Sequence, residues 1–269
     1  MVNSQKQTFS ARVKSTFKAD CKRAFKTPLV YIMTAICFVM PILILVMTSL
    51  MPETSIDANG VETVNEKFTN VWQTLGELPK VLRTSPEQES GMSLLGMCNV
   101  NLLFFAVTTF VCIFTCADFK SGYVKNFFSV RAEKSDYVFS KSLLAFIVAS
   151  LFFIAYFIGA LIGGAISKLS FSTTGFGIMG VICCFLSKIF LTAIFSSISL
   201  LISVAVKNRL WLSLLMSIGA GALLFATIPL ITPLTSTVIN VILCLVGGGL
   251  FAFGLGALSK VVLNKTDVL

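Results

Sequence analysis

The chain has 269 residues, of which 56% are hydrophobic and only 12% are charged, and its net charge is +9. Soluble domains carry roughly twice that share of charged residues, so the composition excludes an ordinary water-soluble globule and predicts one membrane domain over residues 1–269. Histidine is absent, which excludes Ser-His-Asp and Cys-His nucleophile sites and histidine-ligated metals.

The N-terminal segment is basic, with an apolar residue at every fourth position. The apolar positions are Phe9, Val13, Phe17, Cys21 and Phe25. This spacing predicts an amphipathic helix over residues 5–27. We expect it to lie in the inner membrane interface, held by apolar burial and anionic lipid. The alternative is a plain basic tail before the first span.

Six apolar runs follow, each near the roughly 20 residues that cross a bilayer. They predict transmembrane helices at 29–51, 93–117, 142–167, 176–206, 210–229 and 237–259. The expected fold is therefore an all-α polytopic membrane protein, with six spans preceded by an interfacial helix. Gly159 and Gly163 form a GxxxG motif in the third span, which is typical of close helix packing.

The 52–92 segment is the only sizeable loop expected outside the cell. Val71, Leu75, Leu78 and Leu82 have helical spacing, with Pro79 limiting the length of the helix. This short amphipathic helix either gates or recognises a substrate, or it forms a cap without substrate contact. The pattern leaves both alternatives open.

The distribution of basic residues predicts the orientation. Residues 1–28 carry seven bases and one acid, whereas residues 52–92 carry three bases and seven acids. The 118–141 loop is again rich in bases. The positive-inside rule therefore places both termini and the 118–141 loop in the cytoplasm and the 52–92 loop outside. This bias explains the net charge, so we expect no nucleic-acid partner.

The 118–141 loop holds the most informative motif. An acid, a glycine and a lysine follow one another at Asp118, Gly122 and Lys125. The adjacent Phe127 and Phe128 give a short polar helix an apolar patch, which predicts a docking surface. Arg131 and Lys141 add positive charge, and simple cytoplasmic anchoring is the alternative explanation for these bases.

Polar residues inside the spans suggest a second site. Lys188 lies in the fourth predicted span, followed at helical spacing by Thr192, Ser196, Ser199 and Ser203. An intramembrane lysine usually faces a cavity or a partner, so these residues are candidates for a translocation path. Lys188 alternatively extends toward the outer headgroups while the hydroxyls bond between helices. Asn101 and Thr108 form a second polar stripe, for which interhelical bonding is the other explanation.

No catalytic chemistry is apparent in the chain. The eight cysteines form no disulfide or zinc pattern, and no GxxxxGK[ST] sequence is present. We therefore expect no enzyme activity, no metal site and no cofactor in this chain.

The layout and the 118–141 segment resemble the permease subunits of ATP-binding-cassette exporters of the type-2 class (ABC-2). The matching residues are Asp118, Gly122, Lys125, Arg131 and Lys141. The resemblance implies a coupling loop, a cassette ATPase partner that binds ATP and magnesium, and a second permease, the same chain or a different one. It also implies a bacterial plasma membrane and an amphipathic or lipophilic cargo, such as an antimicrobial peptide or a drug, as in producer self-immunity.

Two other classes of protein remain open. An ATP-independent secondary transporter or channel would be favoured by paired acids inside the spans, and none is found. A non-transporting membrane sensor or scaffold would be favoured by a large soluble domain, which is also not found.

Overall fold

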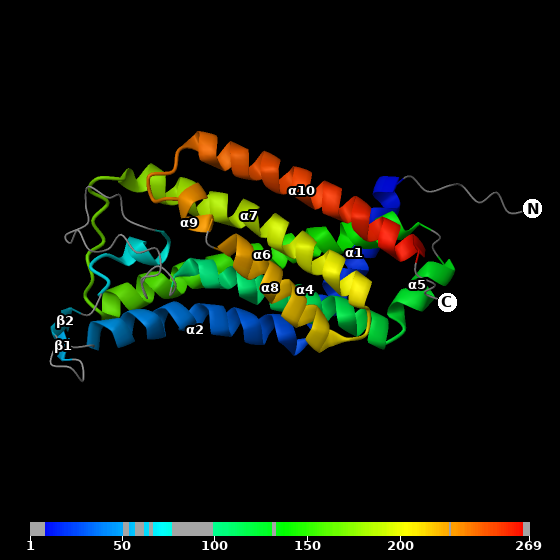
Figure 1. Ribbon diagram of the computed structural model, residues 1–269, viewed down its shortest axis with the longest axis horizontal. Helices are drawn as coiled ribbons and strands as arrows, with labels where there is room; N and C mark the ends of the chain where they lie inside the picture. Colours follow the sequence, from blue (N-terminus) through cyan, green and yellow to red (C-terminus); the bar gives the residue numbers. More distant parts are fainter. Residues whose placement is uncertain are drawn as a thin grey trace, which may run out of the picture.

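The computed structural model describes residues 9–50, 54–56, 62–64, 67–76, 99–130, 133–225 and 227–265. Most of these residues form a bundle of helices along one long axis (Figure 1). The lengthwise helices are α2 (Pro28–Leu50), α4 (Leu103–Lys120), α6 (Lys134–Ile166), α7 (Gly177–Val206), α8 (Leu210–Phe225) and α10 (Val238–Lys265).

The two ends of the bundle carry different elements. Helices α1 (Phe9–Lys26) and α5 (Tyr123–Val130) lie at one end, which we call the α1 end. The opposite end, which we call the η1 end, carries the 3-10 helix η1 (Val71–Thr74) and an antiparallel hairpin of β1 (Thr54–Ile56) and β2 (Glu62–Val64). Apart from this hairpin, whose two strands have three residues each, the described elements are helical, in agreement with the predicted all-α fold. Two short elements, η3 (Val100–Leu102) and α9 (Ile228–Ile231), complete the described chain.

Five helices of the described chain are long and apolar enough to cross a membrane. They are α2, α4 together with η3, α6, α7 and α10, and they match five of the six predicted spans. The predicted span 210–229 contains α8, whose 16 residues extend only about 24 Å. A hydrocarbon core is about 30 Å thick. The pattern of apolar residues therefore overestimated the length of this helix, because α9 begins as a separate helix after it.

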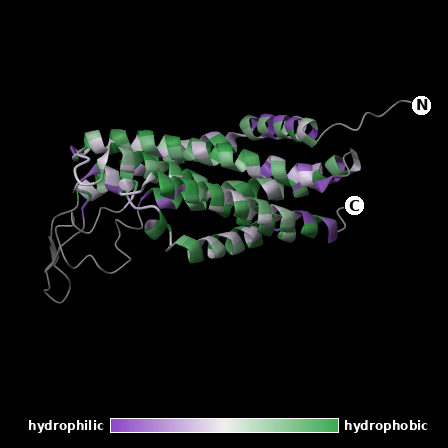
Figure 2. Cartoon of the chain, turned by 90° about the horizontal axis from the view of Figure 1, so that it is seen from above, coloured by the Kyte–Doolittle hydropathy of each residue, from purple (hydrophilic) through white to green (hydrophobic). Residues whose placement is uncertain are grey.

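The outer surface of the bundle is apolar. Helices α2 and α10 are mostly exposed, and their exposed side chains include Ile36, Leu43, Leu250 and Phe253. Figure 2 shows hydrophobic residues along the middle of the lengthwise helices and hydrophilic residues gathered in α1. A water-soluble monomer rarely exposes so large a continuous apolar surface. The chain therefore has the character of a multi-pass membrane protein.

Helix α6 lies at the centre of the bundle and packs closely against α2. A Cβ atom on Gly159 would meet the carbonyl oxygen of Phe38 and Cγ of Pro41, and one on Gly163 would lie 2.9 Å from Cα of Ile42. Larger side chains would separate the two backbones. The GxxxG motif therefore makes the close helix contact that the sequence predicts.

Helix α1 packs against α6 through a face that differs from the predicted apolar stripe. Its buried residues are Val13, Thr16, Asp20 and Ala24. Phe9 and Phe25, the two ends of the predicted stripe, are 48% and 37% exposed. A spacing of four residues drifts around a helix that has 3.6 residues per turn, so the stripe leaves the buried face as it proceeds.

The predicted 118–141 loop is largely helical. Helix α4 continues to Lys120 and α6 begins at Lys134, so α5 occupies most of the connection between them. Residues 5–8 of the predicted interfacial helix and residues 93–98 of the second predicted span lie outside the described residues.

Candidate functional site

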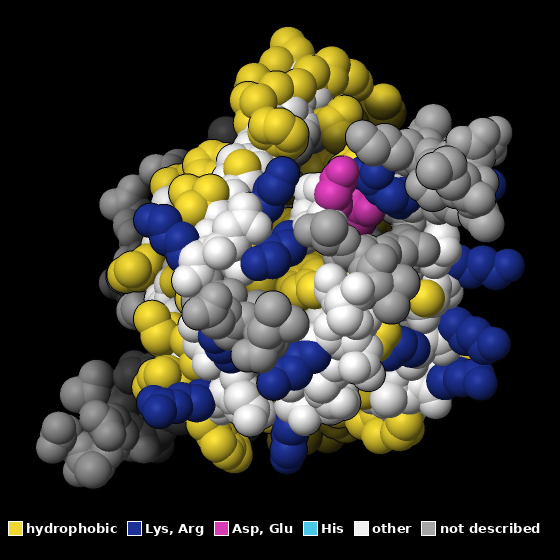
Figure 3. Space-filling view, turned by 90° about the vertical axis from the view of Figure 1, so that its right-hand side faces the viewer, with side chains coloured by type: hydrophobic (Ala, Val, Ile, Leu, Met, Phe, Trp, Pro, Cys, Tyr) yellow, Lys and Arg dark blue, Asp and Glu magenta, His cyan; other side chains and the backbone are white. Residues whose placement is uncertain are grey.

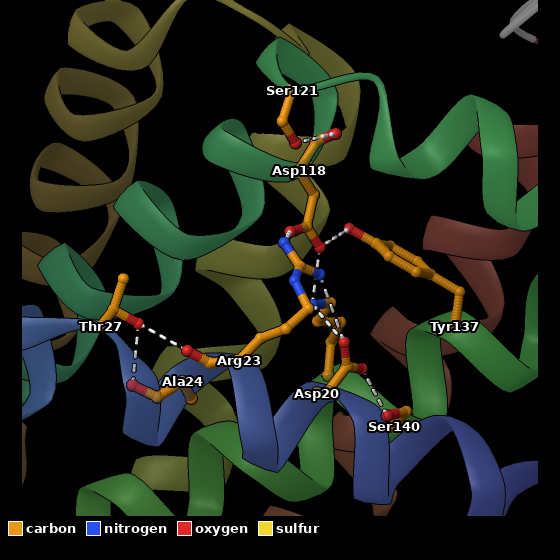
Figure 4. Close-up of polar contacts among 9 residues, drawn as sticks. Asp20, Arg23, Ala24, Thr27, Asp118, Ser121, Tyr137 and Ser140 are labelled. Carbon is orange, nitrogen blue, oxygen red and sulfur yellow. Dashed lines mark hydrogen bonds and ion pairs between the residues drawn. The ribbon is translucent and has the colours of Figure 1, made fainter.

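Four charged side chains meet in the interior of the α1 end. Asp20 and Arg23 come from α1, Asp118 from the last turn of α4, and Lys141 from α6 (Figure 4). The Lys141 ammonium lies 2.9 Å from Asp20 Oδ1 and 2.6 Å from Asp118 Oδ2. Arg23 Nη2 lies 2.5 Å from Asp118 Oδ1. We call these four residues the charge cluster.

Two hydroxyl groups donate hydrogen bonds to the carboxylates of the cluster. Tyr137 donates to Asp118 Oδ2 at 3.2 Å, and Ser140 donates to Asp20 Oδ2 at 2.6 Å. Both carboxylates are fully buried. Buried charges are tolerated when they are paired and hydrogen-bonded, and two carboxylates with two cations leave the cluster neutral. The cluster therefore joins α1, α4 and α6 without a net buried charge.

Aromatic rings cover the cations. The Tyr123 ring centroid lies 3.7 Å from Arg23 Cζ, and the Phe114 centroid lies 4.0 Å from Lys141 Nζ. Burial raises the pKa of the Tyr123 phenol, and the charge of Asp20 raises that pKa further. Burial lowers the pKa of the Arg23 guanidinium, but the hydrogen bond and charge of Asp118 outweigh this effect, so that pKa lies above its ordinary value.

Further contacts tie the first turn of α6 to its neighbours. Arg12 of α1 lies 2.6 Å from Glu133 and 3.0 Å from Asp136. Lys134 donates to the backbone oxygen of Leu263, near the end of α10, at 2.5 Å. The start of α6 is therefore held on two sides.

The structure separates the predicted coupling residues into buried and exposed positions. Asp118 is fully buried in the charge cluster, whereas Lys125 on α5 is exposed. Gly122 has a φ of +73° between α4 and α5, a conformation that glycine adopts without strain. Arg131 lies outside the described residues.

Phe127 and Phe128 pack inward. Their ring centroids lie 6.0 and 5.8 Å from that of Tyr137, and both side chains are half-buried. The exposed face of α5 in this structure is polar, with Lys125, Asn126 and Ser129. The phenylalanine pair therefore attaches α5 to α6 here, and the apolar docking patch expected from the sequence is not displayed.

The surface of the α1 end is strongly basic. Figure 3 faces this end, and its Lys and Arg side chains surround the face, with acidic side chains at one place in the view. Exposed lysines occur on α1 at every fourth residue, at positions Lys14, Lys18, Lys22 and Lys26. Three of the acids near this surface, Asp20, Asp118 and Asp136, are buried, so the exposed charge is mostly positive.

The two predicted polar stripes of the spans meet at one point. Lys188 is fully buried in α7, and its ammonium donates to Asn101 Oδ1 at 2.5 Å. None of the Lys188 side chain is exposed. The contact brings together two candidate residues that are far apart in the sequence.

The hydroxyl groups after Lys188 mostly bond within their own helix. Thr192, Ser196 and Ser199 donate to backbone oxygens of α7, at Ile189, Ala193 and Phe195. Ser203 pairs with Ser213 of α8 at 2.8 Å. Thr108 is buried in α4. Lys188 and Asn101 are therefore the part of the predicted path that the structure brings together as a polar pair.

Sequence reasoning missed Asp20 and Arg23 as partners of Asp118. The available signal was Asp20 itself, the single acid among seven bases in residues 1–28. Among the described residues, no group of three Cys, Asp or Glu side chains could hold a metal ion.

Comparisons of the chain with protein-family models, with curated proteins and with solved structures found no match.

Proposed function

We propose that this chain is the membrane-spanning permease subunit of an ATP-driven exporter of the ABC-2 type, in a bacterial plasma membrane. The α1 end is then cytoplasmic, and α8 with α9 forms the sixth crossing as a broken helix. The observation that carries the proposal is the charge cluster, because it joins α1, α4 and α6, and α5 packs against it through the Tyr123 ring over Arg23.

The connection through α5 gives a mechanical route. Only two residues separate the end of α4 from the start of α5, and Phe127 and Phe128 of α5 pack on Tyr137 of α6. Tyr137 donates to Asp118. A partner that moves α5 would therefore move the inner ends of α4 and α6 together, and α1 with them. This is the property that a coupling element requires.

In this proposal, ATP hydrolysis is carried out by a separate partner protein. The chain has no phosphate-binding sequence motif, so ATP and magnesium would be bound by a separate cassette ATPase. Helices α2, α7, α8 and α10 contain no Asp or Glu. Proton or sodium coupling commonly uses carboxylates inside the spans. Their absence from these helices favours an ATP-driven exporter over an ATP-independent carrier.

The Lys188–Asn101 pair is the proposed polar point of the translocation path. A buried lysine beside an amide suits an anionic group on an otherwise apolar or amphipathic cargo, such as an antimicrobial peptide or a drug. A second permease, of the same or a different chain, would supply the other wall of the path.

The test is purification of the full chain from its native membrane in mild detergent, with identification of the co-purifying proteins. We expect a cassette ATPase in about one-to-one ratio. Lys125→Glu on the exposed face of α5 should reduce ATPase recovery at least several-fold. Lys168→Glu is the matched control, because Lys168 is also exposed but lies in the turn after α6, away from α5.

The proposal fails if the chain is recovered without an ATPase under conditions that keep other membrane complexes intact. That result would favour a channel or an ATP-independent carrier. Equal recovery of ATPase with Lys125→Glu and Lys168→Glu would remove α5 as the coupling element.

A further inference from the structure

Residues 67–76, which we call the plug, fill the η1 end of the bundle. Phe68, Val71 and Leu75 are 4%, 1% and 1% exposed, although they belong to a connection between helices. Val71 packs directly on Gly164 of α6, where any Cβ atom would overlap it. The plug is therefore inserted between helices and does not lie loosely over them.

The plug donates hydrogen bonds from three consecutive residues to the turn between α6 and α7. The Val71 amide donates to the Ser170 oxygen at 3.1 Å, and the Trp72 indole donates to the Phe171 oxygen at 3.0 Å. The Asn70 side chain donates to the Ser172 oxygen at 2.7 Å. Each such bond contributes only about 0.5–1.5 kcal/mol net. The plug is thus seated by apolar packing and neutral hydrogen bonds, which can be broken and remade.

The polar pair of the path lies beneath the plug. The Cys184 thiol donates to the Leu75 oxygen at 3.6 Å. Lys188 follows Cys184 by four residues, so it lies one helical turn further into α7. Asn101, its partner, sits in η3 at the start of α4. Leu75 and Gly76 therefore lie against α7 at Cys184, one turn before Lys188.

We propose that the plug is the outer gate of the translocation path. It covers the segment of α7 next to the Lys188–Asn101 pair in this structure, and it leaves this position when the path opens outward. The inference rests on the proposed function for its orientation. The two ends of the bundle are held differently. Buried ion pairs join the helices at the α1 end, whereas no ion pair between described residues holds the plug, so its withdrawal separates no opposite charges among them.

Gly76 offers a way to lock the gate. A Cβ atom at Gly76 would lie 3.2 Å from the Cys184 sulfur, and a disulfide places these two atoms about 3 Å apart. Gly76→Cys should therefore form a disulfide with Cys184 when diamide is added to membranes, with diamide accepting the two electrons and two protons. Gly76→Cys combined with Cys184→Ser should form none. Absence of the disulfide in the first variant would overturn the placement of the plug.

Opening is tested by labelling Cys184 from outside intact cells with a membrane-impermeant sulfonated maleimide. Cys112, which is fully buried in α4, serves as the internal standard, and mass spectrometry measures both. Leu75→Ala should speed the labelling of Cys184 at least several-fold and leave Cys112 unchanged. Leu230→Ala is the matched control, because Leu230 lies in α9 and is 82% exposed.

The labelling results decide whether the plug is a gate that opens or a cap that stays in place. Unchanged labelling of Cys184 in Leu75→Ala overturns the gate, and equal acceleration at Cys184 and Cys112 also overturns it, since it reports general loosening. The labelling needs no ATPase. If the labelling of Cys184 becomes faster in Leu75→Ala but no ATPase co-purifies, the gate stands and the proposed function is removed. If an ATPase co-purifies but the labelling of Cys184 does not change in Leu75→Ala, the proposed function stands and the gate is removed.

Discussion

Arg23 of α1 and Asp118 of α4 are 95 residues apart in the sequence, and their side chains meet at 2.5 Å. Lys141 of α6 contacts the same aspartate from the other side. A helix that lies at the end of the bundle is thereby joined to two lengthwise helices through one carboxylate. The integrity of this junction should decide whether the α1 end keeps its shape.

Removal of one charge from the cluster should be more damaging than removal of an opposite pair. Lys141→Met leaves two buried carboxylates with one cation, and breaking a buried pair in this way costs about 3–5 kcal/mol. Lys141→Met combined with Asp20→Asn restores neutrality and should lose less stability. Thermal unfolding in mild detergent measures both, with the exposed Lys26→Met as control. A double variant that is less stable than the single one would contradict the expectation.

The stability of the α1 end should decline at alkaline pH through Tyr123. Its pKa is raised by burial and by Asp20, so the folded-state pKa lies above the unfolded value near 10. The neutral phenol is then favoured in the folded state, and its stabilising contribution is present below about pH 10 and is lost as the pH rises through the folded-state pKa.

Tyr123→Phe should therefore flatten the decline of the unfolding temperature between about pH 9 and pH 11. Tyr31→Phe is the control, because Tyr31 is 59% exposed. Parallel curves for the native chain and Tyr123→Phe would rule out this contribution.

Asn101 and Lys188 should respond unequally to substitution. Lys188→Met leaves the neutral amide oxygen of Asn101 without this hydrogen bond, and it should cost less stability than Asn101→Ala, which leaves the lysine nitrogen without it. Asn101→Ala removes the amide oxygen that accepts the Lys188 hydrogen bond at 2.5 Å, and the loss of a buried partner costs about 1–3 kcal/mol.

Unfolding temperature compares the stability of the two variants. For function, ATPase activity of the purified complex should lose its stimulation by amphipathic peptides in Lys188→Met. Unaltered stimulation at normal expression would remove Lys188 from the path.

The contact between α2 and α6 should be sensitive to a single methyl group. Gly159→Ala forces a Cβ atom against the backbone of Phe38, and overpacking of this kind costs about 1–3 kcal/mol. Gly247→Ala in α10 meets nothing within 4 Å and should leave stability unchanged. Thermal unfolding of the two variants checks the difference, and equal unfolding temperatures would show that α2 shifts freely.

The helices were predictable where hydrophobicity is continuous. The apolar run at 176–206 predicts α7 to within one residue at its start, because a long uninterrupted run has few alternative structures. The 210–229 run joined α8 with α9, since apolar content does not record the break near Thr227. The N-terminal extension of α6 to Lys134 was missed because its first turns are polar.

The chemistry of the candidate site was less accessible from the sequence. Spacing identified Asp118 and Lys188 individually, yet their partners Arg23 and Asn101 come from distant segments whose docking depends on tertiary packing. The paired phenylalanines Phe127 and Phe128 predicted an exposed patch, since nothing local indicated that Tyr137 would cover them. The apolar spacing places Leu75 on an amphipathic helix, but it does not indicate that the plug packs closely on other helices, with Val71 against Gly164 and Gly76 beside Cys184.

The neutrality of the charge cluster has a consequence for the membrane voltage. A potential of 100 mV does about 2.3 kcal/mol of work on one elementary charge that crosses the whole membrane, and none on a group that moves with equal positive and negative charge. Motion of Asp20, Arg23, Asp118 and Lys141 as one unit is therefore electrically silent. A protonated Lys188, deep in α7, is instead a charge on which the field acts. A voltage dependence that arises at Lys188 should disappear in Lys188→Met.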